Sequence, residues 1–210
     1  SNSDVTIQDI FEGRLDISEG TRYFAKEQLP EEAWAQILPM VNNYTAEEFA
    51  LATLLPEHED EMKLAMATPH TILTLVHHLL DVQPDEYVGD LCCGSGSGFV
   101  SFAMNQPEAH YFGYEINEER GGIARIRAEL LGSNVQVRLG DVFRLADDKN
   151  TPRFDKMFSN YPFGMRLRYL GEGSDYMERL VEQYPGLSKA TSSDWIFNAL
   201  LCDLLAESGK

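Results

Sequence analysis

The sequence is poor in basic residues. Its 210 residues include 17 Lys and Arg against 34 Asp and Glu, which gives a net charge of −17. Proteins that bind nucleic acid over their whole surface need clustered positive charge, so this composition excludes such a role for the chain as a whole. The acid is concentrated in residues 1–67, which carry 14 acidic and 4 basic side chains. The composition changes near Thr68, and we expect a domain boundary between an acidic helical region, 1–67, and a second domain, 68–210.

Cysteines and long apolar runs are also scarce. The three cysteines (Cys92, Cys93 and Cys202) form no disulfide framework and no metal-binding pattern, and the histidines are not at metal-ligand spacing, so we expect no metal. No apolar run approaches the ~20 residues of a membrane-spanning helix. Nothing at the N-terminus resembles a signal peptide. We therefore expect a cytoplasmic protein in a reducing compartment, without a membrane segment.

The chain does contain a glycine-rich stretch, Val88–Val100, and the other predicted strands and helices are arranged around it. Apolar residues lead into Gly94, Gly96 and Gly98 at alternate positions, and a second apolar run begins at Phe99. This pattern predicts a buried strand, a tight turn and a helix start. A helix behind such a turn points its free N–H groups at whatever occupies the turn.

Strands and helices alternate around this stretch. Thr45 and Glu48 form a capping-box pattern, Pro30–Trp34 is a further helix start, and Thr68 is a plausible N-cap with Pro69 in the first turn. Alternating strands and helices predict an α/β fold with a parallel sheet and right-handed crossovers. The expected strands are 87–91, 110–115, 135–139 and 154–159, and the expected helices are 68–80, 99–105, 123–132 and 194–206.

Three acidic residues follow three of these strands. Asp90 opens the glycine loop, Glu115 ends the second strand, and Asp141 follows the third. A carboxylate about twenty residues after a glycine turn is typical of a ribose-binding acid. A dinucleotide oxidoreductase would have Gly-x-Gly-x-x-Gly, whereas this chain has Gly-Ser-Gly-Ser-Gly. The three acids together favour a methyltransferase.

With these motifs the chain resembles the S-adenosylmethionine-dependent amino-methyltransferases of DNA, and most of all the adenine-specific modification subunits of type I restriction systems. The resemblance covers about residues 66–210 and implies a Rossmann-like class I methyltransferase sheet. The motifs that carry it are Ala67–Pro69, Asp90–Gly96, Gly113–Asn117, Gly140–Phe143, Ser159–Gly164 and Ser193–Phe197.

The resemblance implies a role for each matching residue. Glu115 would bind the ribose hydroxyls of S-adenosylmethionine and Asp141 the amino group of its adenine. Phe197 would pack on the adenine ring, although a core position on an apolar helix face is an equal alternative. Thr68, Pro69, Asp90, Gly94 and Gly96 would surround the methionine end, and Asn160, Tyr161, Pro162 and Phe163 would form the target-base site.

The chemistry of the target amino group explains the Asn160 motif. Its lone pair is delocalised into the adenine ring, and accepting hydrogen bonds from both amino hydrogens would localise it. The Asn160 side-chain oxygen can accept one and the Tyr161 carbonyl the other, while Phe163 can stack on a base flipped out of the duplex. The related enzymes have proline where this chain has Tyr161, so the fixed φ of proline is lost here.

The resemblance implies DNA as the substrate of the full-length protein, with specificity and restriction subunits as partners. Two alternatives remain open: a methyltransferase for guanine in RNA or a glutamine amide in protein, and a cofactor-binding subunit with impaired catalysis. Arg166 and Arg168 are candidates for phosphate contacts or simple solvated charges. Because only four of the seven strands of the related sheet are counted, we expect an incomplete domain that does not by itself bind specific DNA sequences.

Overall fold

The computed structural model describes residues 45, 48, 68–132, 134–145, 147–165, 175–184, 186 and 192–210. The capping box is confirmed: the Thr45 amide donates to Glu48 Oε2 (2.8 Å) and the Glu48 amide to Thr45 Oγ1 (3.2 Å). The helix start expected at Pro30–Trp34, the rest of the acidic region, and Arg166 and Arg168 lie outside the described residues.

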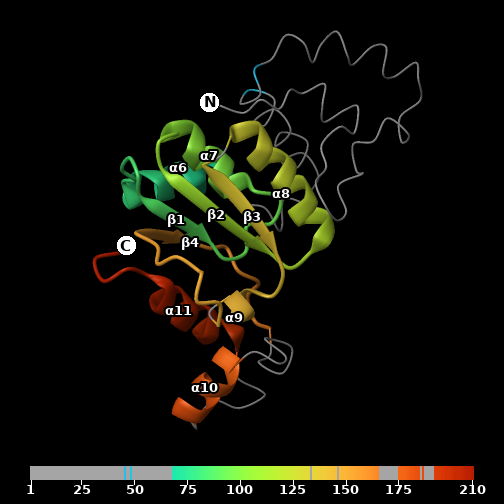
Figure 1. The fold of residues 1–210 in the computed structure, drawn as a ribbon, viewed down its shortest axis with the longest axis vertical. Coiled ribbons are helices and arrows are strands. Elements are labelled where there is room, and N and C mark those ends of the chain that lie inside the picture. The colour runs from blue at the N-terminus through green and yellow to red at the C-terminus, as the bar shows by residue number, and fades with distance from the viewer. Residues whose placement is uncertain are drawn as a thin grey trace, which may run out of the picture.

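The described strands form one parallel sheet in the order β3-β2-β1-β4 (Figure 1). This confirms the predicted α/β class, and it places β1 in the interior, flanked by β2 and β4. Parallel strands bring their carboxyl ends to one edge, where ligands of open α/β sheets bind. The strands are β1 (Tyr87–Asp90), β2 (His110–Glu115), β3 (Val135–Leu139) and β4 (Lys156–Phe158).

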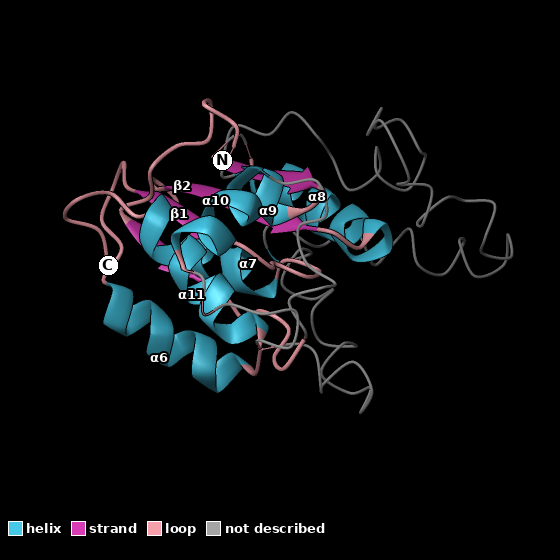
Figure 2. Ribbon diagram, turned by 90° about the horizontal axis from the view of Figure 1, so that it is seen from below, coloured by secondary structure: helices cyan, strands magenta, loops and turns pink. Residues whose placement is uncertain are grey.

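Helices cover both faces of this sheet (Figure 1). On one face lie α6 (His70–Leu80), α7 (Ser97–Asn105) and α8 (Glu118–Leu131). On the other lie α9 (Val142–Leu145), α10 (Asp175–Gln183) and α11 (Ser193–Leu204), and Figure 2 looks at the molecule from this side. No helix in the described ranges is long and apolar enough to cross a membrane.

Each layer of helices has its own apolar core. Successive residues of a strand point to opposite faces, and accordingly Tyr111 packs into the first core and Tyr114 into the second. The first core is built mainly from Leu73, Val88, Phe99, Val100, Phe102 and Ala124. The second is built mainly from Leu91, Phe143, Phe154, Tyr176, Ile196, Phe197 and Leu200.

Several predicted boundaries were wrong. The helix expected from Phe99 begins at Ser97, and α8 begins at Glu118 because the Asn117 side chain caps it by accepting from the Arg120 amide (2.9 Å). Helices α9 and α10 were not predicted. In α10 the signal was Tyr176, Met177 and Leu180, whose helical spacing buries one face.

The last helix ends at Leu204 instead of Ala206. The residues that follow α11 bond with β4 and with the segment that leads into it: the Ala206 amide donates to the Phe154 carbonyl (2.8 Å), and the Lys210 amide donates to the Asp155 carbonyl (2.8 Å). The Met157 amide in turn donates to the Lys210 carbonyl (2.9 Å). Residues 205–210 therefore shield the backbone of β4.

Candidate functional site

The glycine loop, residues 93–97, joins β1 to α7. Gly94 and Gly96 have φ values of 56° and 92°, in the left-handed region that favours glycine. The Gly96 amide donates to the Cys93 carbonyl (2.8 Å), which closes the turn, and a side chain at Gly96 would collide with the Phe99 ring. The predicted strand, turn and helix start are confirmed, and Gly96 is required for the geometry of the turn.

Glu115 fixes this loop from the end of β2. Its Oε2 accepts from the Gly94 amide (2.8 Å) and its Oε1 accepts from the Asn117 amide (2.7 Å). One carboxylate thus holds both the glycine loop and the start of α8. The sequence analysis gave Glu115 a ligand-binding role only. Its bond with the Gly94 amide joins residues 21 positions apart, and a sequence motif does not show such a contact.

Asp90, at the end of β1, is buried under the loop with 7% of its surface exposed. Burial raises the pKa of Asp90 to about 7; the backbone hydrogen bond from Cys92 (3.2 Å) opposes this, and the nearby Glu115 charge adds to it. Burial, together with Asp90 and Glu115, also raises the pKa of the Cys92 and Cys93 thiols. These thiols stay protonated near neutral pH and are poor nucleophiles.

Asp141 occupies the equivalent place after β3. Its Oδ1 accepts from the Phe143 amide (2.9 Å), which starts α9. Asp90, Glu115 and Asp141 therefore stand at the carboxyl ends of three adjacent strands, as their positions in the sequence predicted.

Two adjoining pockets open at this edge. The first has a volume of about 340 Å³ and the second about 510 Å³, within the range of small-molecule sites. Both are lined by Cys92, Gly94, Asn117, Arg120 and Asn160.

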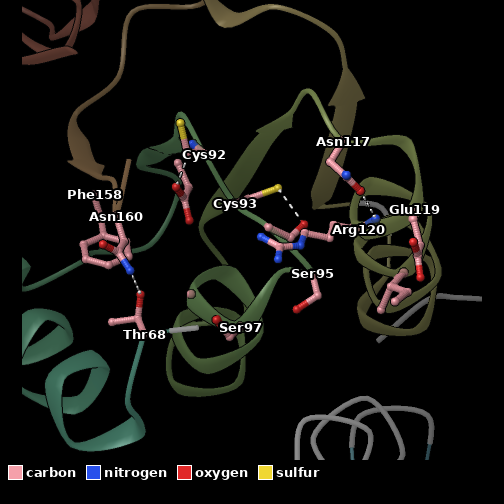
Figure 3. A pocket seen from close by; sticks show the side chains of 14 residues that line it. Thr68, Cys92, Cys93, Ser95, Ser97, Asn117, Glu119, Arg120, Phe158 and Asn160 are labelled. Carbon is pink, nitrogen blue, oxygen red and sulfur yellow. Dashed lines mark hydrogen bonds between the residues drawn. The ribbon is translucent and has the colours of Figure 1, made fainter. Parts of the chain in front are cut away.

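The predicted site residues divide between these pockets. Thr68, Asp90, Gly94 and Asn160 line the first pocket (Figure 3), and Gly94, Glu115, Asp141, Asn160, Tyr161, Pro162, Phe163 and Phe197 line the second. Pro69 and Gly96 line neither: the Pro69 carbonyl accepts the first hydrogen bonds of α6, and Gly96 shapes the turn. Sequence reasoning gave no site role to Asn117, the last residue of the Glu115 motif, and missed Arg120, three residues after it.

The target-base loop, residues 159–165, follows β4 and reaches both pockets. The Asn160 side-chain amide donates from Nδ2 to Thr68 Oγ1 (3.1 Å; Figure 3), across 92 positions of sequence. The Thr68 prediction as N-cap was wrong, because Pro69 holds the cap position of α6 and the Thr68 hydroxyl is used by Asn160. Because the Asn160 side-chain nitrogen is bonded to Thr68, its amide oxygen points the other way and can accept a hydrogen bond from a ligand.

Aromatic rings connect this loop to the core beneath it. The Tyr161 ring stacks parallel on Phe197, with centroids 4.7 Å apart and planes 4° apart, and Phe197 contacts Phe143 at 5.2 Å. Phe197 is only 3% exposed, so it is a core residue whose edge also lines the second pocket. Phe163 lies 5.2 Å from Tyr161 and is 71% exposed, which leaves its ring available to a ligand.

Comparison with known proteins finds the family that the sequence motifs resemble. A family model described as N-6 DNA methylase matches residues 48–210. The methylase subunit of the type I restriction enzyme MjaVIII of Methanocaldococcus jannaschii is 27% identical over 150 residues, which is 64% of this chain and 25% of that protein. The chain thus spans about a quarter of this curated relative.

Two solved structures share the fold. A protein of Listeria monocytogenes assigned to the class I S-adenosylmethionine-dependent methyltransferases matches with a TM-score of 0.64 and 14% identity, over 96% of this chain and 61% of that one. The type I restriction-modification methyltransferase subunit of Streptococcus thermophilus matches with a TM-score of 0.55 and 22% identity, over 68% of this chain and 33% of that one. The fold is that of class I methyltransferases.

Proposed function

Because the chain belongs to the N-6 DNA methylase family, we propose that it transfers a methyl group from S-adenosylmethionine to the exocyclic amino group of adenine in DNA. One observation carries this proposal: the glycine loop, three strand-end carboxylates and Asn160 lie around two adjoining pockets at one edge of the sheet. The motif residues come from positions as far apart as Thr68, which lines the first pocket, and Phe197, which lines the second, and this supports the proposal.

The donor set suits an S-adenosylmethionine molecule. The loop from Cys92 to Gly94, with Thr68 and Asp90, would hold its methionine end in the first pocket. Glu115 would accept from the ribose hydroxyls, and Asp141 would accept from the adenine amino group in the second. Bound there, the cofactor supplies a methyl group activated by a sulfonium. Asn160 lines both pockets, and from there its side chain would reach the target amino group beside the cofactor.

Asn160 and Tyr161 would prepare the target nitrogen. The Asn160 amide oxygen and the Tyr161 carbonyl would each accept a hydrogen bond from one of the two amino hydrogens. These bonds localise the lone pair of the nitrogen and direct it toward the methyl group. The exposed Phe163 ring stacks on the flipped base. The protein's contribution is alignment and electrostatic stabilisation, and no strong general base is needed.

DNA capture and subunit assembly belong to the whole protein. The net charge of −17 offers few groups to neutralise phosphates. We therefore propose that specificity and restriction subunits supply most of the DNA contacts, as in a restriction-modification system.

Radiolabel transfer by the full-length protein tests the proposal. Tritiated S-adenosylmethionine would be offered with adenine-containing duplex DNA, matched RNA and a protein extract, and the labelled base identified by digestion and chromatography. We expect label in N6-methyladenine. Label confined to RNA or protein would assign the alternative substrates, and cofactor binding without transfer to any of them would indicate a catalytically impaired subunit.

A further inference from the structure

Four residues on one face of α11 contact the target-base loop. Ser193, Asp194, Phe197 and Asn198 are spaced so that they line a single side of the helix. Their partners are Pro162, Gly164 and Met165 on one side and Tyr161 on the other. The sequence motif Ser193–Phe197 had indicated this helix, but not what most of its residues do.

The N-terminal turn of α11 fixes the second half of the loop. The Ser193 hydroxyl donates to the Pro162 carbonyl (3.2 Å), and the Ser193 amide donates to the Met165 carbonyl (2.7 Å). The Gly164 amide donates to Asp194 Oδ1 (3.0 Å), which lowers the pKa of that carboxyl. The Pro162 carbonyl is therefore engaged by Ser193, whereas the hydrogen bonds between described residues leave the carbonyl before it, that of Tyr161, open to a ligand.

The next turn of α11 fixes the first half of the loop through the Tyr161 side chain. The ring lies flat on Phe197, and the phenol donates to Asn198 Oδ1 (3.1 Å). Phe197 is itself held in the core against Phe143. An anchored tyrosine restricts its own backbone from the side-chain end, whereas proline restricts φ through its ring.

We propose that the Tyr161 side chain is a positioning device that replaces the proline of the related motif. Docked on Phe197 and Asn198, it holds the Tyr161 carbonyl at the distance from Asn160 that two-point recognition of an amino group requires. This inference rests on the proposed methyl transfer, because it assigns the carbonyl to the substrate of that reaction. Tyr161 acts through its carbonyl, and its ring need not touch the base.

Steady-state kinetics of the full-length protein provide the first test. Tyr161→Ala should lower kcat by about 10- to 100-fold, since a misplacement of about 1 Å is enough for such a loss. Tyr161→Phe keeps the ring stack and should stay within about threefold of wild type, on the scale of one exposed neutral hydrogen bond. Tyr161→Pro should recover at least part of the activity lost in the alanine variant. Tyr184→Ala, a half-exposed tyrosine next to α10, is the matched control.

Hydrogen exchange of the peptide spanning the target-base loop gives a second readout that does not depend on catalysis. Exchange at the Asn160 amide, which lies in the half of the loop that Tyr161 fixes, should speed up in Tyr161→Ala and not in Tyr161→Phe or Tyr184→Ala. A wild-type protein that transfers no methyl group would refute the proposed function, while exchange would still test the anchoring. Unchanged exchange in Tyr161→Ala, unchanged kcat in that variant, or a proline variant no better than alanine would each overturn the positioning role.

Discussion

The glycine loop and the target-base loop lie at the same edge of the sheet and are held by different means. The glycine loop is fixed by its backbone geometry, with Gly94 and Gly96 at positive φ, by the Glu115 carboxylate on the Gly94 amide, and by the buried Arg127, which donates to the Ser95 carbonyl (2.6 Å). The target-base loop is fixed by side chains from elsewhere: Thr68 binds Asn160, and α11 binds residues 161–165.

The two ways of holding a loop suit two different tasks, binding the cofactor and presenting functional groups to the target base. A loop with glycine in its turn can surround a cofactor closely, because no side chain projects from Gly94, which lines both pockets. A loop that is held by neighbouring side chains can expose its own functional groups, such as Phe163, while its backbone stays in place. Changes in the first loop should therefore act on folding and cofactor binding, and changes in the second should act on turnover.

Asn160→Ala should give the largest effect and the clearest separation of the two loops. Loss of the amide oxygen removes one acceptor of the target amino group, and methyl transfer should fall by about 100-fold or more. Affinity for S-adenosylhomocysteine, measured by calorimetry, should change little. Asn150→Ala, in the turn where Asn150 bonds Asp148, is the matched control. Near-native turnover in Asn160→Ala would refute the lone-pair mechanism.

Gly96→Ala should have the next largest effect, on folding. The left-handed backbone costs an alanine about 1 kcal/mol, and the methyl group would overlap the Phe99 ring, for a loss of roughly 3 kcal/mol in unfolding free energy. Gly94→Ala is a sharp control, because its added Cβ meets nothing within 4 Å and only the backbone cost applies. Urea denaturation measures both. Equal losses in the two variants would mean that the Phe99 contact has no role.

These two loops also differ in how far the sequence could predict them. The glycine turn, the strand-end acids and the parallel sheet follow from local patterns, and all were predicted. The contacts of Tyr161 with Phe197 and of Asn160 with Thr68 join residues 36 and 92 positions apart. No local pattern contains such pairs. For the same reason the motif gave Phe197 two equal roles, and its burial became visible only in the packed fold.

Glu115→Gln tests the carboxylate that serves the glycine loop. Glutamine keeps one oxygen acceptor for a backbone amide but loses the charge, so affinity for S-adenosylhomocysteine should fall by about 1–3 kcal/mol. Alanine would mix this effect with release of the Gly94 and Asn117 amides. Glu119→Gln, an exposed neighbour that lines the first pocket, controls for the loss of one negative charge. Unchanged calorimetric affinity in Glu115→Gln would remove Glu115 from the ribose site.

Asp90 leads to the last prediction, a dependence of folding stability on pH that builds up gradually over several pH units. Its pKa is about 7 in the folded protein against an ordinary 3.8, so the folded state holds a proton that the unfolded chain has released between these values. The contribution of Asp90 to the unfolding free energy should therefore be fully present below about pH 4 and should be lost as the pH rises toward 7, by at most about 1.4 kcal/mol per unit.

Asp90→Asn stays neutral and should flatten this part of the stability profile. Urea denaturation at half-unit steps from pH 4 to pH 8 would compare the variant with wild type, so that groups titrating in both proteins cancel. Asp155→Asn is the matched control. It removes a carboxylate at the opposite end of β1, where Asp155 accepts a hydrogen bond from the Tyr87 amide. If the stability profile of Asp90→Asn had the same slope as that of the wild type, a group other than Asp90 would cause the slope.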